Sequence, residues 1–249
     1  MNGQNIAVGW PLACVLLLLA CAGALVVWLG RIDGWRPTAT AAVRAVVQLA
    51  AVSLLITAVL ASGWLTAGFV LLMYGIAAVT SAGRIAKAGA LGRLRTVPVP
   101  ALSIAAGVAP VLALLLGTRV VQAQPVVIIP IAGIFIGGAM MATSLAGRRA
   151  YDELRTRRGE YEAALALGLL PRDAALLISR PTADQALVPV LDQTRTVGLV
   201  TLPGAFVGVL LGGGDPIQAG VTQLVVLISL LAIEAAAVLV TVELVARRA

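Results

Sequence analysis

The sequence contains no histidine, a single lysine and few charged or aromatic side chains. Without histidine, the chain cannot form a serine–histidine catalytic pair or a histidine-ligated metal centre. Charged residues make up 12% of the 249 residues and hydrophobic residues 60%, whereas about a quarter of a soluble domain is charged. The chain must therefore be solvated mainly by lipid.

Cysteine is also scarce, which argues against a disulfide framework. Cys14 and Cys21 are the two cysteines, and they lie seven residues apart within one apolar run. This spacing places them on one face of a helix. We expect both to be buried as small hydrophobic residues rather than to form a disulfide or a metal site.

Long apolar runs dominate what is present. About 20 helical residues cross a bilayer core of roughly 30 Å, and the continuous runs indicate helices rather than barrel strands. We expect an all-α polytopic membrane protein with a single transmembrane domain over residues 1–249. Hydropathy predicts seven spans, at about 8–29, 40–60, 64–82, 99–117, 125–147, 196–213 and 219–245. The first run is too long for a signal-peptide core, so we expect a membrane helix there.

The distribution of basic residues predicts the orientation. With the N-terminus outside, the inside connections hold all but two of the 18 basic residues. The exceptions are Arg119, in an outside connection, and Arg44, within a span. Cytoplasmic loops are enriched in Lys and Arg, so we predict an N-out, C-in protein of the cytoplasmic membrane. The net charge of +7 then reflects topology, and no nucleic-acid partner is expected.

The one long polar connection, 148–195, contains a short amphipathic helix pattern. Glu160 and Glu162 lie near its start, where negative charge suits the helix dipole. Ala163 and Ala164 offer a small apolar surface, and Gly168 is a suitable residue for the helix C-terminus. Such a helix can dock in the groove of a partner protein or lie on lipid headgroups.

The same stretch, 162 EAALALG 168 followed after nine residues by Ile178, resembles the cytoplasmic coupling motif of ATP-driven permeases. The chain also resembles the seven-helix ABC permease family (UPF0014-type) of bacterial iron exporters and plant aluminium-tolerance permeases. The resemblance rests on 44 RAVVQL 49, 130 PIAG 133, 139 AM 140 and the stretch that begins 196 TVGLVTLPG 204. Two positions depart from the family pattern: Gly138 replaces an asparagine, and Glu234 replaces a small or apolar residue.

The resemblance implies a transport subunit, not an enzyme, in which Glu160, Glu162, Ala163, Ala164, Gly168 and Ile178 couple to a separate ATPase. The only lysine, Lys87, lies outside any P-loop pattern, which agrees with this. We therefore expect two copies of an ATP-binding cassette subunit, a permease homodimer, no cofactor, and metal ions, iron above all, as the transported substrate. A metal-ligating set is not recognisable in the sequence.

Several residues within the spans are candidates for the transport path or for a hinge. Arg44 and Gln48 are one turn apart, and Glu234 lies near the middle of the last span. Each has a structural interpretation as well: snorkelling for Arg44, helix bridging for Gln48, and pairing or protonation for Glu234. Pro203 and Gly204 are expected to kink the sixth span. The alternative function is an ion-coupled secondary transporter that uses Glu234 as its intramembrane carboxylate.

Overall fold

A computed structural model describes residues 9–32, 34–88 and 92–248 of the chain. In these residues the regular structure is helical, apart from one isolated bridge between Val197 and Thr201. The all-α prediction is thus confirmed. Two compact units can be distinguished in the chain, Met1–Ala61 and Ser62–Ala249, and a single transmembrane domain over residues 1–249 stays a prediction.

The N-terminal unit is a pair of helices, α1 (Trp10–Leu29) and α2 (Trp35–Leu60). Neither helix buries a residue, and both are apolar enough to cross a membrane. Cys14 and Cys21 are free thiols exposed on α1, so the expectation that they are buried is wrong. A membrane helix does not need to bury small residues such as cysteine, because lipid solvates apolar side chains.

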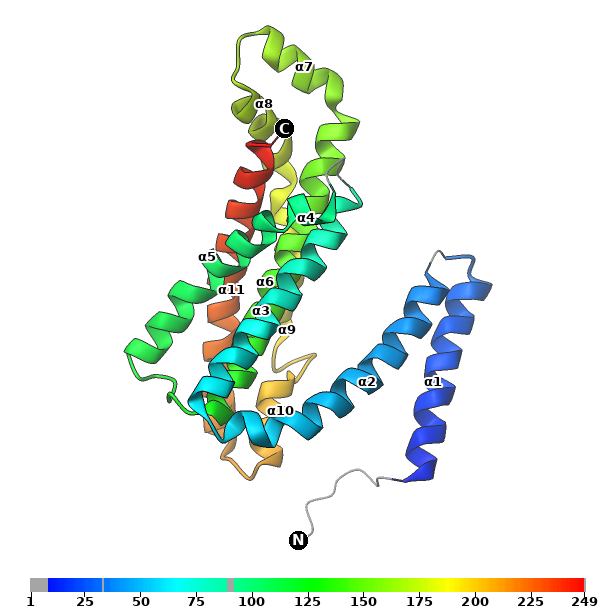
Figure 1. The fold of residues 1–249 in the computed structure, drawn as a ribbon, viewed down its shortest axis with the longest axis vertical. Coiled ribbons are helices and arrows are strands. Elements are labelled where there is room, and N and C mark those ends of the chain that lie inside the picture. The colour runs from blue at the N-terminus through cyan, green and yellow to red at the C-terminus, as the bar shows by residue number, and fades with distance from the viewer. Residues whose placement is uncertain (1–8, 33, 89–91, 249) are drawn as a thin grey trace. The chain divides into compact units, whose positions relative to one another are not determined.

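The second unit is built around four long helices: α3 (Gly63–Ala86), α5 (Pro98–Gly117), α6 (Pro125–Thr156) and α11 (Pro216–Ala246). Figure 1 shows α3, α5, α6 and α11 side by side. Their contact surfaces hold a buried core that includes Ile104, Phe135 and Ile233. Shorter elements complete the unit: α4 (Arg93–Thr96), α7 (Arg158–Ala166), α8 (Pro171–Ser179), η1 (Arg180–Ala186), α9 (Val188–Thr196) and α10 (Gly204–Leu211).

Local sequence explains where the long helices begin. Pro98, Pro125 and Pro216 each occupy the first position of a helix, where the missing N–H removes no hydrogen bond. Asp215 caps α11, because its carboxylate accepts hydrogen bonds from the backbone N–H of Ile217 at 3.0 Å and of Gln218 at 3.3 Å. These three spans are therefore started by a residue that satisfies or removes an orphan donor.

Small residues allow the helices to approach closely. A Cβ added at Gly107 on α5 would lie 2.5 Å from the carbonyl oxygen of Ile233 on α11. On α6, the hydroxyl of Ser144 donates a hydrogen bond to the hydroxyl of Ser81 on α3 at 3.0 Å. Close backbone packing and polar bridging of this kind hold helices together in lipid, where no hydrophobic effect drives their association.

Six helices in the described residues are long and apolar enough to span a membrane: Trp10–Leu29, Trp35–Leu60, Gly63–Ala86, Leu94–Gly117, Pro125–Thr156 and Pro216–Ala246. They coincide with six of the seven expected spans. The expected span at 196–213 is not a single helix: α9 ends at Thr196, residues 197–203 are non-helical, and α10 begins at Gly204. Hydropathy alone does not reveal this break, because the whole stretch is apolar.

Candidate functional site

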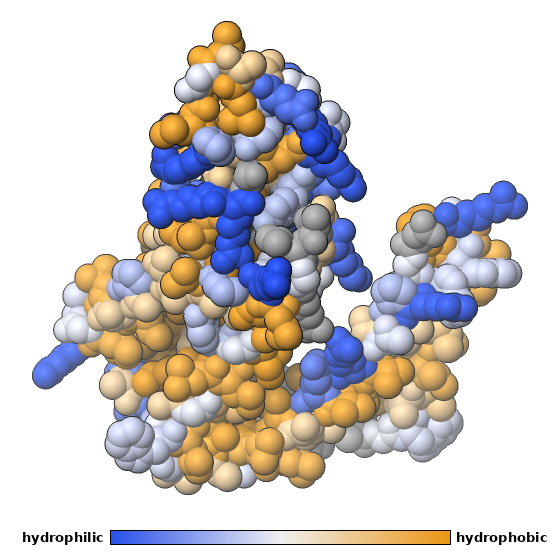
Figure 2. All heavy atoms as spheres, turned by 45° about the horizontal axis from the view of Figure 1, so that its top comes forward, coloured by the Kyte–Doolittle hydropathy of each residue, from blue (hydrophilic) through white to orange (hydrophobic). Residues whose placement is uncertain are grey.

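The second unit has one strongly basic end, formed by the ends of α3, α6 and α11 together with α4, α7 and α8 (Figure 1). This basic end carries Arg84, Arg95, Arg172, Arg180, Arg247 and Arg248, among others. Figure 2 shows hydrophilic residues gathered there, whereas apolar residues dominate the surface further down the unit. The opposite end holds Arg119 in the connection between α5 and α6. The charge asymmetry read from the sequence is therefore a spatial asymmetry of the second unit.

Helix α7 lies at the basic end and directly continues the long helix α6 after Arg157. Glu160 and Glu162 are exposed, and both make ion pairs at the start of the helix. Arg157 Nε donates to Glu160 Oε1 at 2.8 Å, and Arg158 Nε donates to Glu162 Oε1 at 2.8 Å. The hydrogen bond from Arg157 holds the pKa of Glu160 below its usual range, so this carboxylate is charged at neutral pH.

Gly168 ends α7 as the spacing predicts. Its φ is +91°, a conformation that favours glycine. The N–H of Gly168 donates to the carbonyl of Leu165 at 2.9 Å, and the N–H of Leu169 donates to that of Ala164 at 3.1 Å. These two bonds form a Schellman motif, which turns the chain from α7 into α8.

The residues expected to contact a partner fall into two groups. Glu160, Glu162 and Ala163 are exposed on α7. Ala164 is buried, and Ile178 on α8 is buried to 1% exposure. Ala164 and Ile178 therefore pack α7 and α8 against the rest of the unit. The surface available to a partner is formed by Glu160, Glu162 and Ala163, together with Leu167, which is 82% exposed.

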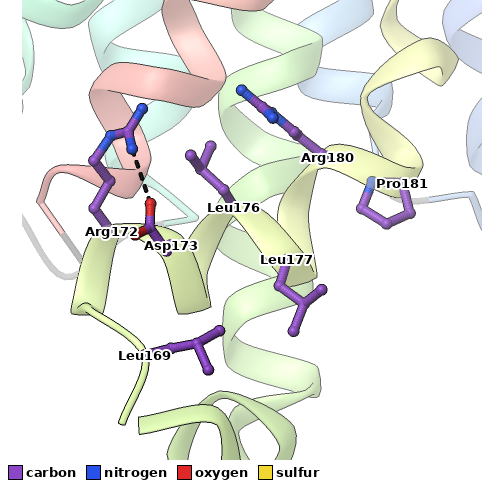
Figure 3. Close-up of a pocket in the computed structure, with 7 residues that line it drawn as sticks. All are labelled: Leu169, Arg172, Asp173, Leu176, Leu177, Arg180 and Pro181. Carbon is purple, nitrogen blue, oxygen red and sulfur yellow. Dashed lines mark hydrogen bonds and ion pairs between the residues drawn. The ribbon is translucent and has the colours of Figure 1, made fainter.

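An open groove of about 460 Å³ lies beside α8. Figure 3 shows its lining residues, Leu169, Arg172, Asp173, Leu176, Leu177, Arg180 and Pro181. The two arginines lie on either side of Leu176 (Figure 3). The groove therefore combines apolar side chains with charges of both signs, since Asp173 lines it as well and pairs with Arg172 at 2.8 Å.

Arg172 also connects α8 to α11, a contact that sequence reasoning missed. Its Nε lies 2.6 Å from Glu243 Oε1 and its Nη2 lies 2.8 Å from Glu243 Oε2. Glu243 accepts a further hydrogen bond from Arg247 at 2.8 Å. A carboxylate near the end of a span and an arginine after Pro171 were visible in the sequence, but their separation of 71 positions gave no indication that they meet.

Glu234 lies in the middle of α11 and is 7% exposed. It lines a cavity of about 200 Å³ together with residues of α6, η1 and α9, including Gly138 and Gln193. A Cβ added at Gly138 would lie 2.7 Å from Glu234 Oε1. The two positions singled out as departures from the family pattern are therefore neighbours in space.

Pro203 and Gly204 mark a complete break rather than a kink in a continuous helix. Pro203 precedes α10, and Gly198 in the same break has a φ of +81°. Residues of the break line a cavity of about 330 Å³ with Gln223 of α11, whose Oε1 is buried without a hydrogen-bond partner in the part of the chain that the structure describes. Gln223 is a further polar residue that was not predicted, because a single amide in an apolar run is a weak signal.

Arg44 and Gln48 lie one turn apart on α2 of the N-terminal unit, and both side chains are exposed there. The α6–α11 cavity is formed by residues of the second unit. Among residues 9–32, 34–88 and 92–248, no group of three or more His, Cys, Asp and Glu side chains could hold a metal ion.

Comparison with known proteins places this architecture in a family. Residues 10–249 match the model described as "Uncharacterised protein family (UPF0014)". The chain is 40% identical over 162 residues to the UPF0014 membrane protein STAR2 of Oryza sativa subsp. japonica, covering 65% of this chain and 56% of that protein. It is 37% identical over 166 residues to the protein ALUMINUM SENSITIVE 3 of Arabidopsis thaliana, covering 67% and 59%.

A bacterial relative is the probable iron export permease protein FetB of Escherichia coli (strain K12), which is 34% identical over 131 residues, covering 53% of this chain and 50% of that protein. The matched stretches thus span little more than half the length of these curated relatives. No solved structure matches the chain. The family match, which extends over all the long helices, and the six membrane-spanning candidates together show that this chain belongs to the UPF0014 family of multi-pass membrane proteins.

Proposed function

We propose that the chain is the permease subunit of an ABC transporter in the cytoplasmic membrane and that it exports a metal cation. A separate subunit hydrolyses the ATP, and two permeases pair with two such subunits. One observation carries the proposal: α7 is a short, exposed, glycine-terminated helix at the basic end, held by ion pairs at its start. A helix presented in this way is suited to docking in a groove of a motor protein.

The orientation that the proposal requires is supported by charge. The basic end holds the arginines of α6–α8 and of the C-terminus, and loops on the cytoplasmic side of a membrane are enriched in such residues. The proposed N-out, C-in topology counts α9, the break and α10 together as one discontinuous crossing. The cargo is inferred from the printed name of the bacterial relative, an iron export permease.

The contacts at the basic end provide a route for force. Movement of α7 would pass to α8 through the Gly168 turn and the buried Ile178. From α8 it would pass to α11 through the bond between Arg172 and Glu243. Because α11 carries Glu234 and packs against α5, α6 and α10, displacement of this one helix would change the shape of the membrane-embedded cavities.

The test is reconstitution with the ATP-binding subunit that copurifies with the tagged chain. The parent complex should hydrolyse ATP faster than the isolated subunit, and Glu162→Arg, which replaces an exposed acid on α7 by a base, should remove this stimulation. Arg119→Glu, a charge reversal at the opposite end, is the matched control and should retain it. The proposal fails if no ATP-binding subunit copurifies, or if Glu162→Arg stimulates hydrolysis as the parent does.

An ion-coupled secondary transporter is the second candidate, and the buried carboxylate of Glu234 favours it. The two functions differ in their energy source. Proteoliposomes that contain the chain alone should accumulate no metal cation when a proton or sodium gradient is imposed. Gradient-driven uptake without the ATP-binding subunit would select the secondary transporter.

A further inference from the structure

The cavity beside Glu234 is lined by residues of α6, η1, α9 and α11 of the second unit and has a volume of about 200 Å³. Helix α11 packs against both α6 and α9 in the second unit. The polar side chains of the cavity are Glu234 from α11 and Gln193 from α9, while Met141, Pro189 and Leu230 contribute apolar surface.

The carboxylate of Glu234 has no hydrogen-bond or ion-pair partner among residues 62–88 and 92–248, the part of the second unit that the structure describes, although the residue is only 7% exposed. No basic side chain lines the cavity. A buried carboxylate without a counter-charge is strongly destabilising, and an ionisable group within a membrane span is therefore usually functional.

Helix α6 leaves space for the Glu234 carboxylate at Gly138, which has no side chain. At Gly138 any side chain would intrude, because a Cβ there would lie 2.7 Å from Glu234 Oε1 and 2.7 Å from Leu230 Cδ2. The adjacent Gly137 has open space instead, with no atom within 4 Å of an added Cβ. A side chain at Gly138 would therefore displace the Glu234 carboxylate from its present position.

From this geometry we propose that the cavity is a binding site for a partly hydrated metal cation, with Glu234 as its charged ligand and Gln193 as a neutral oxygen ligand. The proposal rests on the proposed function, since it names the place and chemical state of the cargo. Carboxylate and amide oxygens are hard ligands that suit cations with an oxygen preference. Two protein ligands do not complete a coordination sphere, and the cavity has room for several water molecules that would supply the rest.

The size of the cavity and its single charge also indicate how the ion leaves. An ion that keeps its waters and meets one carboxylate is bound less tightly than in a closed cage of several acidic ligands, which favours release in a transporter. Gln193 lies on α9, one element before the break at 197–203. A shift of α9 relative to α11 would separate the two ligands and open the site.

Mn²⁺ is the chosen probe, because the electron paramagnetic resonance signal of free hydrated Mn²⁺ decreases when the ion binds to a protein. The purified chain in lipid nanodiscs, without any ATP-binding subunit, should bind Mn²⁺, and Fe²⁺ under anaerobic conditions should compete. Glu234→Gln keeps the shape of the side chain but removes its charge. It should weaken binding by at least roughly 10-fold, the lower bound for loss of a partner in a metal site.

Gly138→Ala should also weaken binding, whereas Gly137→Ala should bind as the parent does. Asp152→Asn is the control for loss of an acid, since Asp152 lies at the surface and pairs with Arg155 at 3.0 Å. Thermal unfolding of each variant checks that it is folded. Absence of Mn²⁺ binding to the parent, or unchanged binding to folded Glu234→Gln, would overturn the site; neither result affects the stimulation of ATP hydrolysis that tests the proposed function.

Discussion

Arg172 on α8 donates two hydrogen bonds to Glu243 on α11, from Nε to Oε1 at 2.6 Å and from Nη2 to Oε2 at 2.8 Å. The hydrogen bond to Glu243 raises the pKa of the Arg172 guanidinium. Paired donors facing paired acceptors fix the direction of this contact as well as its distance. The bond therefore connects the exposed α7–α8 region to the helix that carries Glu234.

Arg172→Gln should weaken the connection between α8 and α11 while leaving the protein folded, because the pair is partly exposed. We expect the variant to bind the ATP-binding subunit and to hydrolyse ATP, but to transport less metal for each ATP consumed. Arg155→Gln, which removes an arginine that pairs within α6, is the control. Equal transport per ATP in Arg172→Gln and the parent would show that force does not pass through this bond.

Gly168→Ala should loosen the end of α7, because the φ of +91° costs a residue with a Cβ roughly 1–2 kcal/mol. Gly159→Ala, within the same helix and with no atom within 4 Å of an added Cβ, should instead stabilise α7 slightly. Hydrogen exchange of residues 158–169 measures both effects. Faster exchange in Gly159→Ala than in Gly168→Ala would contradict the role assigned to the turn.

The start of α7 should depend on pH through Glu160. Arg157 lowers the pKa of this carboxylate by donating a hydrogen bond to it. A lowered folded-state pKa means that the bond stabilises the helix at neutral pH and that its contribution is lost as the pH falls through the lowered pKa. Compared at each pH, the parent should exchange hydrogens over residues 157–166 more slowly than Glu160→Gln at neutral pH, and at the same rate in strongly acidic buffer. If the parent and Glu160→Gln still exchanged at different rates in strongly acidic buffer, the Arg157–Glu160 pair could not be the cause of the difference.

Gly107→Ala should destabilise the second unit, because its Cβ would lie 2.5 Å from the carbonyl oxygen of Ile233. Overpacking of this kind typically costs about 1–3 kcal/mol. Gly137→Ala meets no atom within 4 Å and serves as the matched control. Thermal unfolding in detergent should separate the two variants; equal unfolding temperatures would show that α5 and α11 can move apart without cost.

The sequence predicted the long helices well, because α1, α3, α5 and α11 follow apolar runs that have no competing interpretation. Two features escaped it for physical reasons. Helix α6 continues to Thr156, nine residues beyond the apolar run, where the polar pair Arg149–Glu153 supports another turn. The stretch 196–213 is apolar enough for a span, yet Gly198 and Pro203 break its helix, and hydropathy does not measure backbone conformation.

The candidate site was predictable only in its local parts. The position of α7 and its end at Gly168 follow from short-range rules and could be predicted, whereas the role of Glu160 and Glu162 in contacting a partner stays a prediction. Contacts between distant elements do not follow from such rules, which is why the pairing of Arg172 with Glu243 was missed. The close approach of Gly138 to the Glu234 carboxylate likewise depends on the packing of α6 against α11, which short-range rules do not predict.

Helix α7 is the proposed contact for an ATP-binding subunit, and site-directed cross-linking tests this contact directly. In a chain whose own thiols are removed by Cys14→Ser and Cys21→Ser, Ala163→Cys places a thiol on the exposed surface of α7, and Gln122→Cys places one at the opposite end of the second unit. With a short bifunctional reagent in membranes, Ala163→Cys should cross-link to the copurifying ATP-binding subunit and Gln122→Cys should not. Cross-linking from Gln122→Cys alone, or from neither position while the complex is intact, would contradict the account.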